Sequence, residues 1–435
     1  MTKNKKNIVV IGLDDFNLTL LAKINNANDY NFLKLFSYRD IVRPKDIDPE
    51  HLLARADQEL STLSRVDAVV GYWDFPTNTI LPILRQRLGL PGPSLEAVLK
   101  CEHKYWSRLE QHAAVPEAVP AFHAFDPFDE KAAEHLDLAF PCWIKPVTAH
   151  SSYLGLKVRN KAEFEAAQPC LRHGIAHFGE PLDVLLKHAD LPKEVAALGG
   201  RACIAEEIIS KGSQCTLECY VLRNEVVTYG VVDSLREGKH RSSFQRYQYP
   251  SHLPKHVIQR MIDVTKRIIK RIGLDNTPFN IEFYWDLRAD TLRLLEINTR
   301  ISKSHCPLFW MVDGISHHEV MVEVALGNRP AMPYRHGRHK VAAKFMLRRF
   351  EDAIVTHIPG TKEVSAMREK YPDAELRLVV KEGMRLSDLL LQDSYSYELA
   401  ELFLGSTSQK QLLASYRDSL DVLDFRFAPI NNLAA

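Results

Sequence analysis

Apolar and polar residues over the first 95 positions alternate between strand-like and helix-like patterns. Residues 7–13, NIVVIGL, form an apolar run of strand length, and helical material follows around LTLLAKI. A second apolar strand, VDAVVGYWD at 66–74, precedes the helix-like run NTILPILRQRLGL, which stops at Gly89. Because strands that alternate with helices usually build parallel sheets, this pattern predicts a small open parallel sheet.

The middle of the chain predicts several short strands between longer helices. Ser94 follows the break PGPS and is expected to cap a single helix over 94–112, SLEAVLKCEHKYWSRLEQH. An amphipathic helix over 254–273 is expected to stop at Gly273. Strands are expected at 141–147, 154–160, 201–209, 216–224 and 226–234, and a further helix at 161–174. The tail beyond Pro330 reads as a separate α+β piece.

The segments FNIEFYWD, 279–286, and TLRLLEIN, 291–298, predict a β-hairpin. A turn centred at Ala289 places Glu282 opposite Glu296 and Asn280 opposite Asn298, whereas a slip of one residue would move one glutamate to the other face. Opposed residues have Cβ atoms only about 4.5–5.5 Å apart, so two carboxylates there are costly unless they share a proton or a cation. The alternative to a cation site is a solvated sheet face with scattered glutamates.

Mg²⁺ characteristically takes one or two carboxylates together with substrate phosphates. Glu282 and Glu296 are therefore candidate metal ligands, with the amide oxygen of Asn298 completing the set. A site of this kind predicts a nucleoside triphosphate nearby, and cationic side chains that bind its phosphates.

Composition excludes several other classes of function. The chain has 56 Lys and Arg against 55 Asp and Glu, so charge supports neither nucleic-acid nor anionic-membrane binding. Seven cysteines without a CxxC motif indicate reduced thiols and a cytoplasmic location. The basic start meets Asp14 and Asp15 after a short apolar run, which favours a first strand over a signal peptide. The sequence has no HExxH, GxGxxG or GxxxxGK[ST] motif.

Several of these segments resemble the ATP-grasp superfamily, in the family's order over roughly residues 66–330. In chain order they are DAVVGYWD, LGLPGPSLEAVLKCEHKYWSR, CWIKPV, IAEEIISKGSQCTLE, FNIEF and LEINTRIS. The resemblance implies ATP and Mg²⁺ (or Mn²⁺) as cofactors, with Lys104 and Lys145 on phosphate oxygens. It also implies roles for the loop residues Ser151 and Ser152 over the phosphates, for Glu206, Glu207, Ile208 and Ile209 around adenine, and for Gln214 at a ribose position where many relatives have Glu.

The resemblance implies a reaction in which ATP phosphorylates a carboxylate and a nucleophile then attacks the acyl phosphate. Arg300 is implied to stabilise the acyl phosphate and the oxyanion that follows, although it could simply balance the glutamate pair. Ser152, His240 and Arg241 are further candidate catalytic residues. LEINTRI is also similar to biotin carboxylase, but Ser304 stands where that enzyme has a catalytic Glu before its His. This departure argues against carboxylation.

The tail, with KVAAKFMLRRF, IPGTKEV and LRLVVKEGMRLSD, is similar to the C-terminal domain of L-amino-acid ligases. We therefore expect an α/β protein with the ATP-grasp fold. Its domains are a Rossmann-like pre-ATP-grasp domain at 1–100, an ATP-grasp core at 101–330 with a lid at about 140–205, and a C-terminal α+β domain at 331–435.

The expected function is ATP-dependent carboxylate–amine ligation that makes a dipeptide or similar amide and releases ADP and phosphate. The expected partners are small-molecule substrates, namely an amino acid or another carboxylate and an amine. Neither nucleic acid nor a membrane is expected as a partner, and whether the protein forms a homodimer is an open question. The alternatives are another ATP-grasp chemistry (carboxylase-like or thiol ligation) and a non-catalytic nucleotide-binding module. A nicotinamide-binding protein is disfavoured because the glycine fingerprint is missing.

Overall fold

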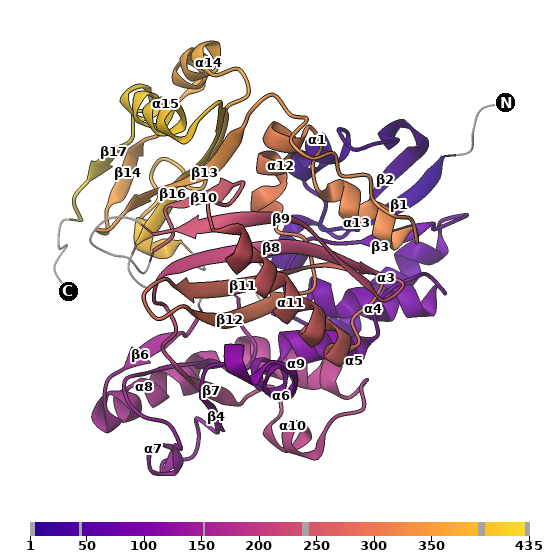
Figure 1. Cartoon of the computed structure of the whole chain (residues 1–435), viewed down its shortest axis with the longest axis vertical. Helices are drawn as coiled ribbons and strands as arrows, with labels where there is room; N and C mark the ends of the chain where they lie inside the picture. Colours follow the sequence, from indigo (N-terminus) through magenta and orange to yellow (C-terminus); the bar gives the residue numbers. More distant parts are fainter. Residues whose placement is uncertain (1–4, 43–45, 151–152, 237–242, 390–395, 431–435) are drawn as a thin grey trace. The chain divides into compact units, whose positions relative to one another are not determined.

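The structure is a computed structural model that describes residues 5–42, 46–150, 153–236, 243–389 and 396–430 (Figure 1). The chain divides into two compact units. The first unit comprises Met1–Gly230, Leu253–Lys303 and His317–Met332, and the second comprises Val231–His252, Ser304–Ser316 and Pro333–Ala435. In the part of the chain that is described, none of the helices combines the length and the apolar character that crossing a membrane requires.

The first unit holds three sheets and most of the helices. Its described helices are α1 (Asp15–Leu21), α2 (Tyr38–Val42), α3 (Pro49–Ser61), α4 (Thr77–Arg87), α5 (Leu95–Glu102), α6 (Lys104–Ala114), α7 (Ala132–His135), α8 (Lys161–Gly174), α9 (Ala176–Leu186), α10 (Lys193–Leu198), α11 (Lys255–Ile272) and α13 (His318–Ala325).

The N-terminal sheet is parallel, as the alternation of strands and helices predicted. Its strands are β1 (Lys6–Ile11), β2 (Tyr30–Leu35) and β3 (Ala68–Val70), in the order β2-β1-β3 (Figure 1). All of β3 and the apolar end of β1 are buried, which matches their continuous apolar runs. The chain leaves β3 toward Asp74, which lies just before α4.

The second sheet is antiparallel, with strand order β4-β7-β5-β6. Its strands are β4 (Phe122–Phe125), β5 (Cys142–Pro146), β6 (Leu156–Val158) and β7 (Cys203–Glu207). One face packs in an apolar cluster with α8, including Phe125, Phe164 and Leu171. The strands predicted at 141–147, 154–160 and 201–209 and the helix at 161–174 are all confirmed.

The third sheet of the first unit has the order β12-β11-β8-β9. Its strands are β8 (Ser213–Leu222), β9 (Glu225–Leu235), which ends in the second unit, β11 (Thr277–Asp286) and β12 (Thr291–Asn298). Arg223 and Asn224 form the tight β8–β9 turn with φ of 52° and 66°, the backbone that a two-residue hairpin loop requires.

The two faces of this sheet differ in chemistry because side chains alternate along each strand. Cys215, Leu217, Ile281 and Phe283 are fully buried on one face. Helix α11 packs on that face, where the sulfur of Met261 lies 3.5 Å from that of Cys215 (Figure 1). The other face is polar. It carries Gln214, Thr216, Glu218, Asn280, Glu282, Glu296 and Asn298.

Helices α5 and α6 replace the single helix that the sequence predicted over 94–112. Ser94 caps α5 as expected, since its hydroxyl accepts from the N–H of Ala97 at 3.2 Å. The prediction is wrong at His103, which has extended φ and ψ of −78° and 100° and caps α6 by accepting from the N–H of Trp106 at 3.2 Å. Its Nε2 lies 3.2 Å from the carbonyl of Gly199. Apolar spacing continues through both helices, so it does not reveal this buried cap.

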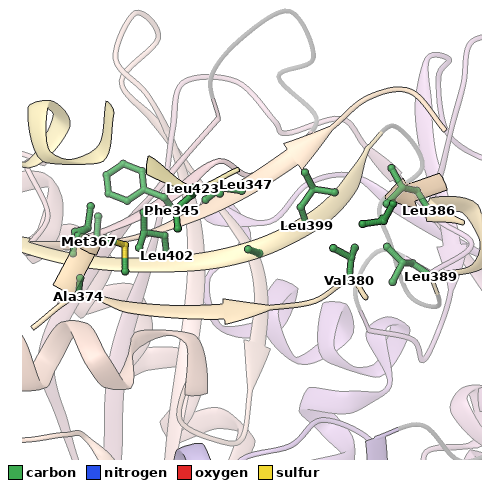
Figure 2. Close-up of a cluster of buried hydrophobic side chains, with 14 of the residues drawn as sticks. Phe345, Leu347, Met367, Ala374, Val380, Leu386, Leu389, Leu399, Leu402 and Leu423 are labelled. Carbon is green, nitrogen blue, oxygen red and sulfur yellow. The ribbon is translucent and has the colours of Figure 1, made fainter. Parts of the chain in front are cut away.

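The second unit contains a sheet in the order β9-β10-β13-β16-β15 and a separate β14-β17 pair. Its described elements are β10 (Arg246–Tyr249), α12 (Cys306–Asp313), β13 (Val341–Arg349), β14 (Ile354–His357), α14 (Thr361–Lys370), β15 (Glu375–Leu378), β16 (Tyr397–Ser406), α15 (Gln409–Val422) and β17 (Arg426–Ala428). Figure 2 shows side chains of its buried core, among them Phe345 and Leu347 of β13 with Leu399 and Leu402 of β16.

His103 predicts a specific loss of stability in acid. Burial lowers the pKa of His103 from 6.5 to about 4, so the unfolded chain binds a proton more readily than the folded protein. The free energy of unfolding should be unaffected above pH 6.5 and fall as the pH drops from there toward 4. Asn is a good cap that does not titrate, so His103→Asn should remove up to about 3 kcal/mol of this loss.

Urea unfolding of both proteins at pH 7 and pH 4.5 measures the difference. His51→Asn, at an exposed position on α3, is the control and should keep the acid dependence of the original chain. An equal loss of stability in the original chain and in His103→Asn would contradict the assignment.

Candidate active site

The β11–β12 hairpin brings together the polar side chains that the sequence singled out. Glu282 lies opposite Glu296, and Asn280 lies opposite Asn298, so the predicted pairing is confirmed. Nearer the turn, however, Phe283 pairs with Leu294, because a β-bulge shifts the register by one residue. The extra residue in this bulge is Leu295.

The bulge decides which face Glu296 occupies. If the register of the turn-proximal half continued without it, Glu282 would lie opposite Leu295. Glu296 would then point to the apolar face of the sheet, because neighbouring side chains alternate. With the bulge in place, both carboxylates lie on the polar face of the sheet. From the sequence alone, this placement required an assumption about the centre of the turn.

Amide groups surround the two carboxylates. Gln214 donates from Nε2 to Glu282 at 2.9 Å, and Asn298 donates from Nδ2 to Asn280 at 3.1 Å and to Glu296 at 3.4 Å. These neutral donors offset only part of the repulsion between two carboxylates. The donor set of two carboxylates and the amide oxygen of Asn298 is all oxygen, which fits Mg²⁺ or Mn²⁺.

Lys104 interacts electrostatically with both Lys145 and Glu296 of the hairpin. Lys104 is the first residue of α6, and its ammonium donates to the carbonyl of Ala149 at 2.8 Å. Burial lowers the pKa of Lys104, and Lys145 adds to this, while the carboxylates of Glu102, Glu296 and Glu206 act in the opposite direction. The break at His103 therefore places a partly buried cation close to the glutamate pair.

Glu206 has a role that the sequence did not suggest. Its buried carboxylate lies 2.7 Å from Nε of Arg108 and 2.6 Å from Nζ of Lys145. Burial alone would raise its pKa, but these two cations lower it to about 2, so Glu206 is ionised. Through this ion pair it holds Lys145, which extends from the neighbouring strand β5.

The segment predicted to surround adenine divides into two parts. Glu206 lies inside β7, opposite Phe122 on one side and Trp143 on the other, so its main chain belongs to the sheet. Glu207 is the exposed last residue of β7, and the partly buried Ile208 and Ile209 follow the strand. A role of Glu207, Ile208 and Ile209 around the nucleotide base stays a prediction.

Arg300 binds Asp74, a residue that the sequence analysis did not select. Both Nε and one terminal nitrogen of Arg300 lie 2.5 Å from the same oxygen of Asp74. Burial would raise the pKa of Asp74, but Arg300 above all, with His150 and Lys303, lowers it. The direct partner of Arg300 is therefore Asp74 rather than the glutamate pair, although the charge of Glu296 also acts on Arg300.

Other predicted site residues lie outside the described part of the chain. They are Ser151, Ser152, His240 and Arg241. Among the residues that sequence reasoning missed, Asp74 carried a usable signal, because it lies in the segment that follows the buried strand β3 of a parallel sheet. Arg108 carried none, since two of its partners are main-chain carbonyls that leave no trace in the sequence.

Comparisons with known proteins agree with this architecture. Residues 138–306 match the family model described as ATP-grasp domain. The whole structure is similar to the crystal structure of L-amino acid ligase from Bacillus licheniformis, with a TM-score of 0.70 at 17% sequence identity over 99% of this chain and 100% of that chain.

Two curated sequences are also similar to this chain. The uncharacterized protein y4rH of Sinorhizobium fredii (strain NBRC 101917 / NGR234) is 22% identical over 354 residues, 80% of this chain and 66% of that protein. A D-alanine–D-alanine ligase of Synechococcus sp. (strain RCC307) is 23% identical over 196 residues, 42% of this chain and 48% of that protein. The match thus spans about half of that ligase and just under two thirds of y4rH. The chain therefore contains an ATP-grasp domain at residues 138–306, and it has the ATP-grasp fold.

Proposed function

We propose that the protein is an ATP-dependent carboxylate–amine ligase that joins an amino acid or a related carboxylate to an amine, with release of ADP and phosphate. One observation carries the proposal. Glu282 and Glu296 oppose each other on the polar face of the hairpin, and the charge of Glu296 acts on both Lys104 and Arg300. Paired carboxylates next to several cations suit a metal–nucleotide complex.

Each of these side chains has a part in binding. Glu282, Glu296 and Asn298 would hold Mg²⁺ or Mn²⁺, which when bound neutralises charge on the transferred phosphoryl group. Lys104 and Lys145 would contact phosphate oxygens as point charges. Ile208 and Ile209 would pack around the base, and Gln214, through its bond to Glu282, would orient a metal ligand rather than contact the ribose.

The proposed reaction has two steps. An oxygen of the substrate carboxylate bonds to the γ-phosphorus of ATP while the bond from that phosphorus to the ADP oxygen breaks. The amine nitrogen then bonds to the acyl carbon, loses a proton and expels phosphate. Arg300, oriented by Asp74 at 2.5 Å, would stabilise negative charge on the acyl phosphate and on the tetrahedral oxyanion.

Amino acids are the favoured substrates because of two similarities. One structural relative that aligns over its full length is an L-amino acid ligase, and the curated sequence relatives include D-alanine–D-alanine ligases. Ser304, in the position where biotin carboxylases have a glutamate, favours an amine over bicarbonate as the second reactant. Product masses distinguish an amide from a carboxylated product or a thioester.

Loss of one glutamate should abolish the reaction. Glu296→Gln keeps the shape of the side chain but removes half of the paired charge, so phosphate release with Mg²⁺, ATP and mixed amino acids should fall by more than the ~10–100-fold that loss of an outer-sphere partner costs. Glu225→Gln, at an exposed ion pair on β9, is the control. Unchanged turnover in Glu296→Gln would rule out the metal role.

Arg300 predicts an effect on turnover rather than on nucleotide binding. Arg300→Lys cannot keep both nitrogens on Asp74 while it reaches the acyl phosphate. We expect kcat to fall by about 10²–10³-fold while the KM for ATP changes little. Steady-state kinetics with ATP varied at saturating amine measures both. A raised KM with normal kcat would instead assign Arg300 to nucleotide binding.

A further inference from the structure

A buried arginine outside the predicted set contacts the bulge of β12. The guanidinium of Arg108 donates to the carbonyl of Leu294 at 3.0 Å and to that of Leu295 at 2.9 Å. Arg108 lies on α6 one turn after Lys104, and it is only 2% exposed. Its remaining bonds go to Glu206 and Gln111.

The geometry of these two bonds is specific to a bulge. In a regular strand, successive carbonyls point toward opposite edges, so one planar guanidinium could not bind two neighbouring carbonyls. At a bulge the extra residue loses its ladder partner. A buried carbonyl without a partner costs about 1–3 kcal/mol, and Arg108 supplies charge-assisted bonds at this point.

The bulge in turn keeps Glu296 on the face of Glu282. We propose that Arg108 is a positioning residue: by binding the carbonyls of Leu294 and Leu295 it holds the bulge, and so holds Glu296 where it can share a divalent cation with Glu282. This inference rests on the proposed function. It adds that the metal ligands are aligned by a side chain that contacts neither metal nor substrate.

Arg108 also connects β12, which carries the candidate metal ligand Glu296, to Lys145, a candidate phosphate-binding residue. Glu206 binds Arg108 with one oxygen and Lys145 with the other. Because the carboxylate is ionised between two cations, a shift of either one costs a charge-assisted bond of about 1.5–3 kcal/mol. The position of Lys145 and the register of β12 are therefore coupled through Arg108.

The test is binding of Mn²⁺ with a non-hydrolysable ATP analogue, followed by electron paramagnetic resonance of the ion. Arg108→Met replaces the guanidinium, with all of its N–H donors, by an apolar side chain of similar length. It should weaken Mn²⁺ binding by about 10–100-fold. Arg108→Lys keeps the charge but presents a single ammonium, so it should fall between Arg108→Met and the original chain. Equal binding in all three proteins would overturn the proposal.

Arg85 provides a matched control. It lies on α4 and is also 2% exposed. Its Nε donates to the carbonyl of Val69 at 2.7 Å, so it contacts β3 of the N-terminal sheet rather than β12 of the hairpin. Arg85→Met should lower thermal stability without weakening Mn²⁺ binding. If Arg85→Met and Arg108→Met weaken it equally, Arg108 acts only through general stability.

Hydrogen exchange without metal or nucleotide gives a second readout. Peptides covering residues 291–298 should exchange faster in Arg108→Met than in the original chain and in Arg85→Met, because the bulge is no longer held. Unchanged exchange in that segment would contradict the proposal. Absence of Mn²⁺ binding in the original chain would instead refute the proposed function, so the two failures are distinguishable.

Deletion of Leu295 isolates the role of the bulge. The turn-proximal register then continues without a bulge and still pairs Glu296 with Glu282. In this background Arg108→Met should weaken Mn²⁺ binding by less than about threefold, against the ~10–100-fold expected in the full sequence. The same large loss in both backgrounds would show that Arg108 acts by another route.

Discussion

Two carboxylates opposite each other on one face of a hairpin are the constraint on which the rest of the site depends. Glu282 and Glu296 repel at the separation that a directly opposed pair imposes. Amide donors from Gln214 and Asn298 offset part of that repulsion, and nearby cations offset more. The remaining negative charge of two opposed carboxylates suits a small divalent ion.

The surrounding charges come from three separate parts of the first unit. The segment between β3 and α4 provides Asp74 for Arg300, the start of α6 provides Lys104, and the second sheet provides Lys145 with its partner Glu206. Each cation has at least one acidic partner or a main-chain carbonyl, so the buried charges are paired as burial requires. This pairing fixes the side chains in advance of the nucleotide that the proposed function requires.

The similarity to known proteins explains the architecture better than the chemistry. A TM-score of 0.70 at 17% identity to L-amino acid ligase of Bacillus licheniformis shows a shared fold, but one fold supports many reactions. The chemistry of a site depends on single residues. Gln214, for example, bonds to a candidate metal ligand. Substrate choice is therefore a property of such positions and not of the fold.

The sequence by itself determined the parallel N-terminal sheet, most strands, and the β-hairpin that carries Glu282 and Glu296. These follow from periodicity and short-range turn geometry, which neighbouring residues encode. Only the tertiary structure decided the helix break at His103, the bulge at Leu295 and the contacts of Arg108 and Asp74. Each of these depends on a partner far along the chain, often a main-chain carbonyl such as that of Gly199 or Leu294, and local patterns carry no information about such long-range contacts.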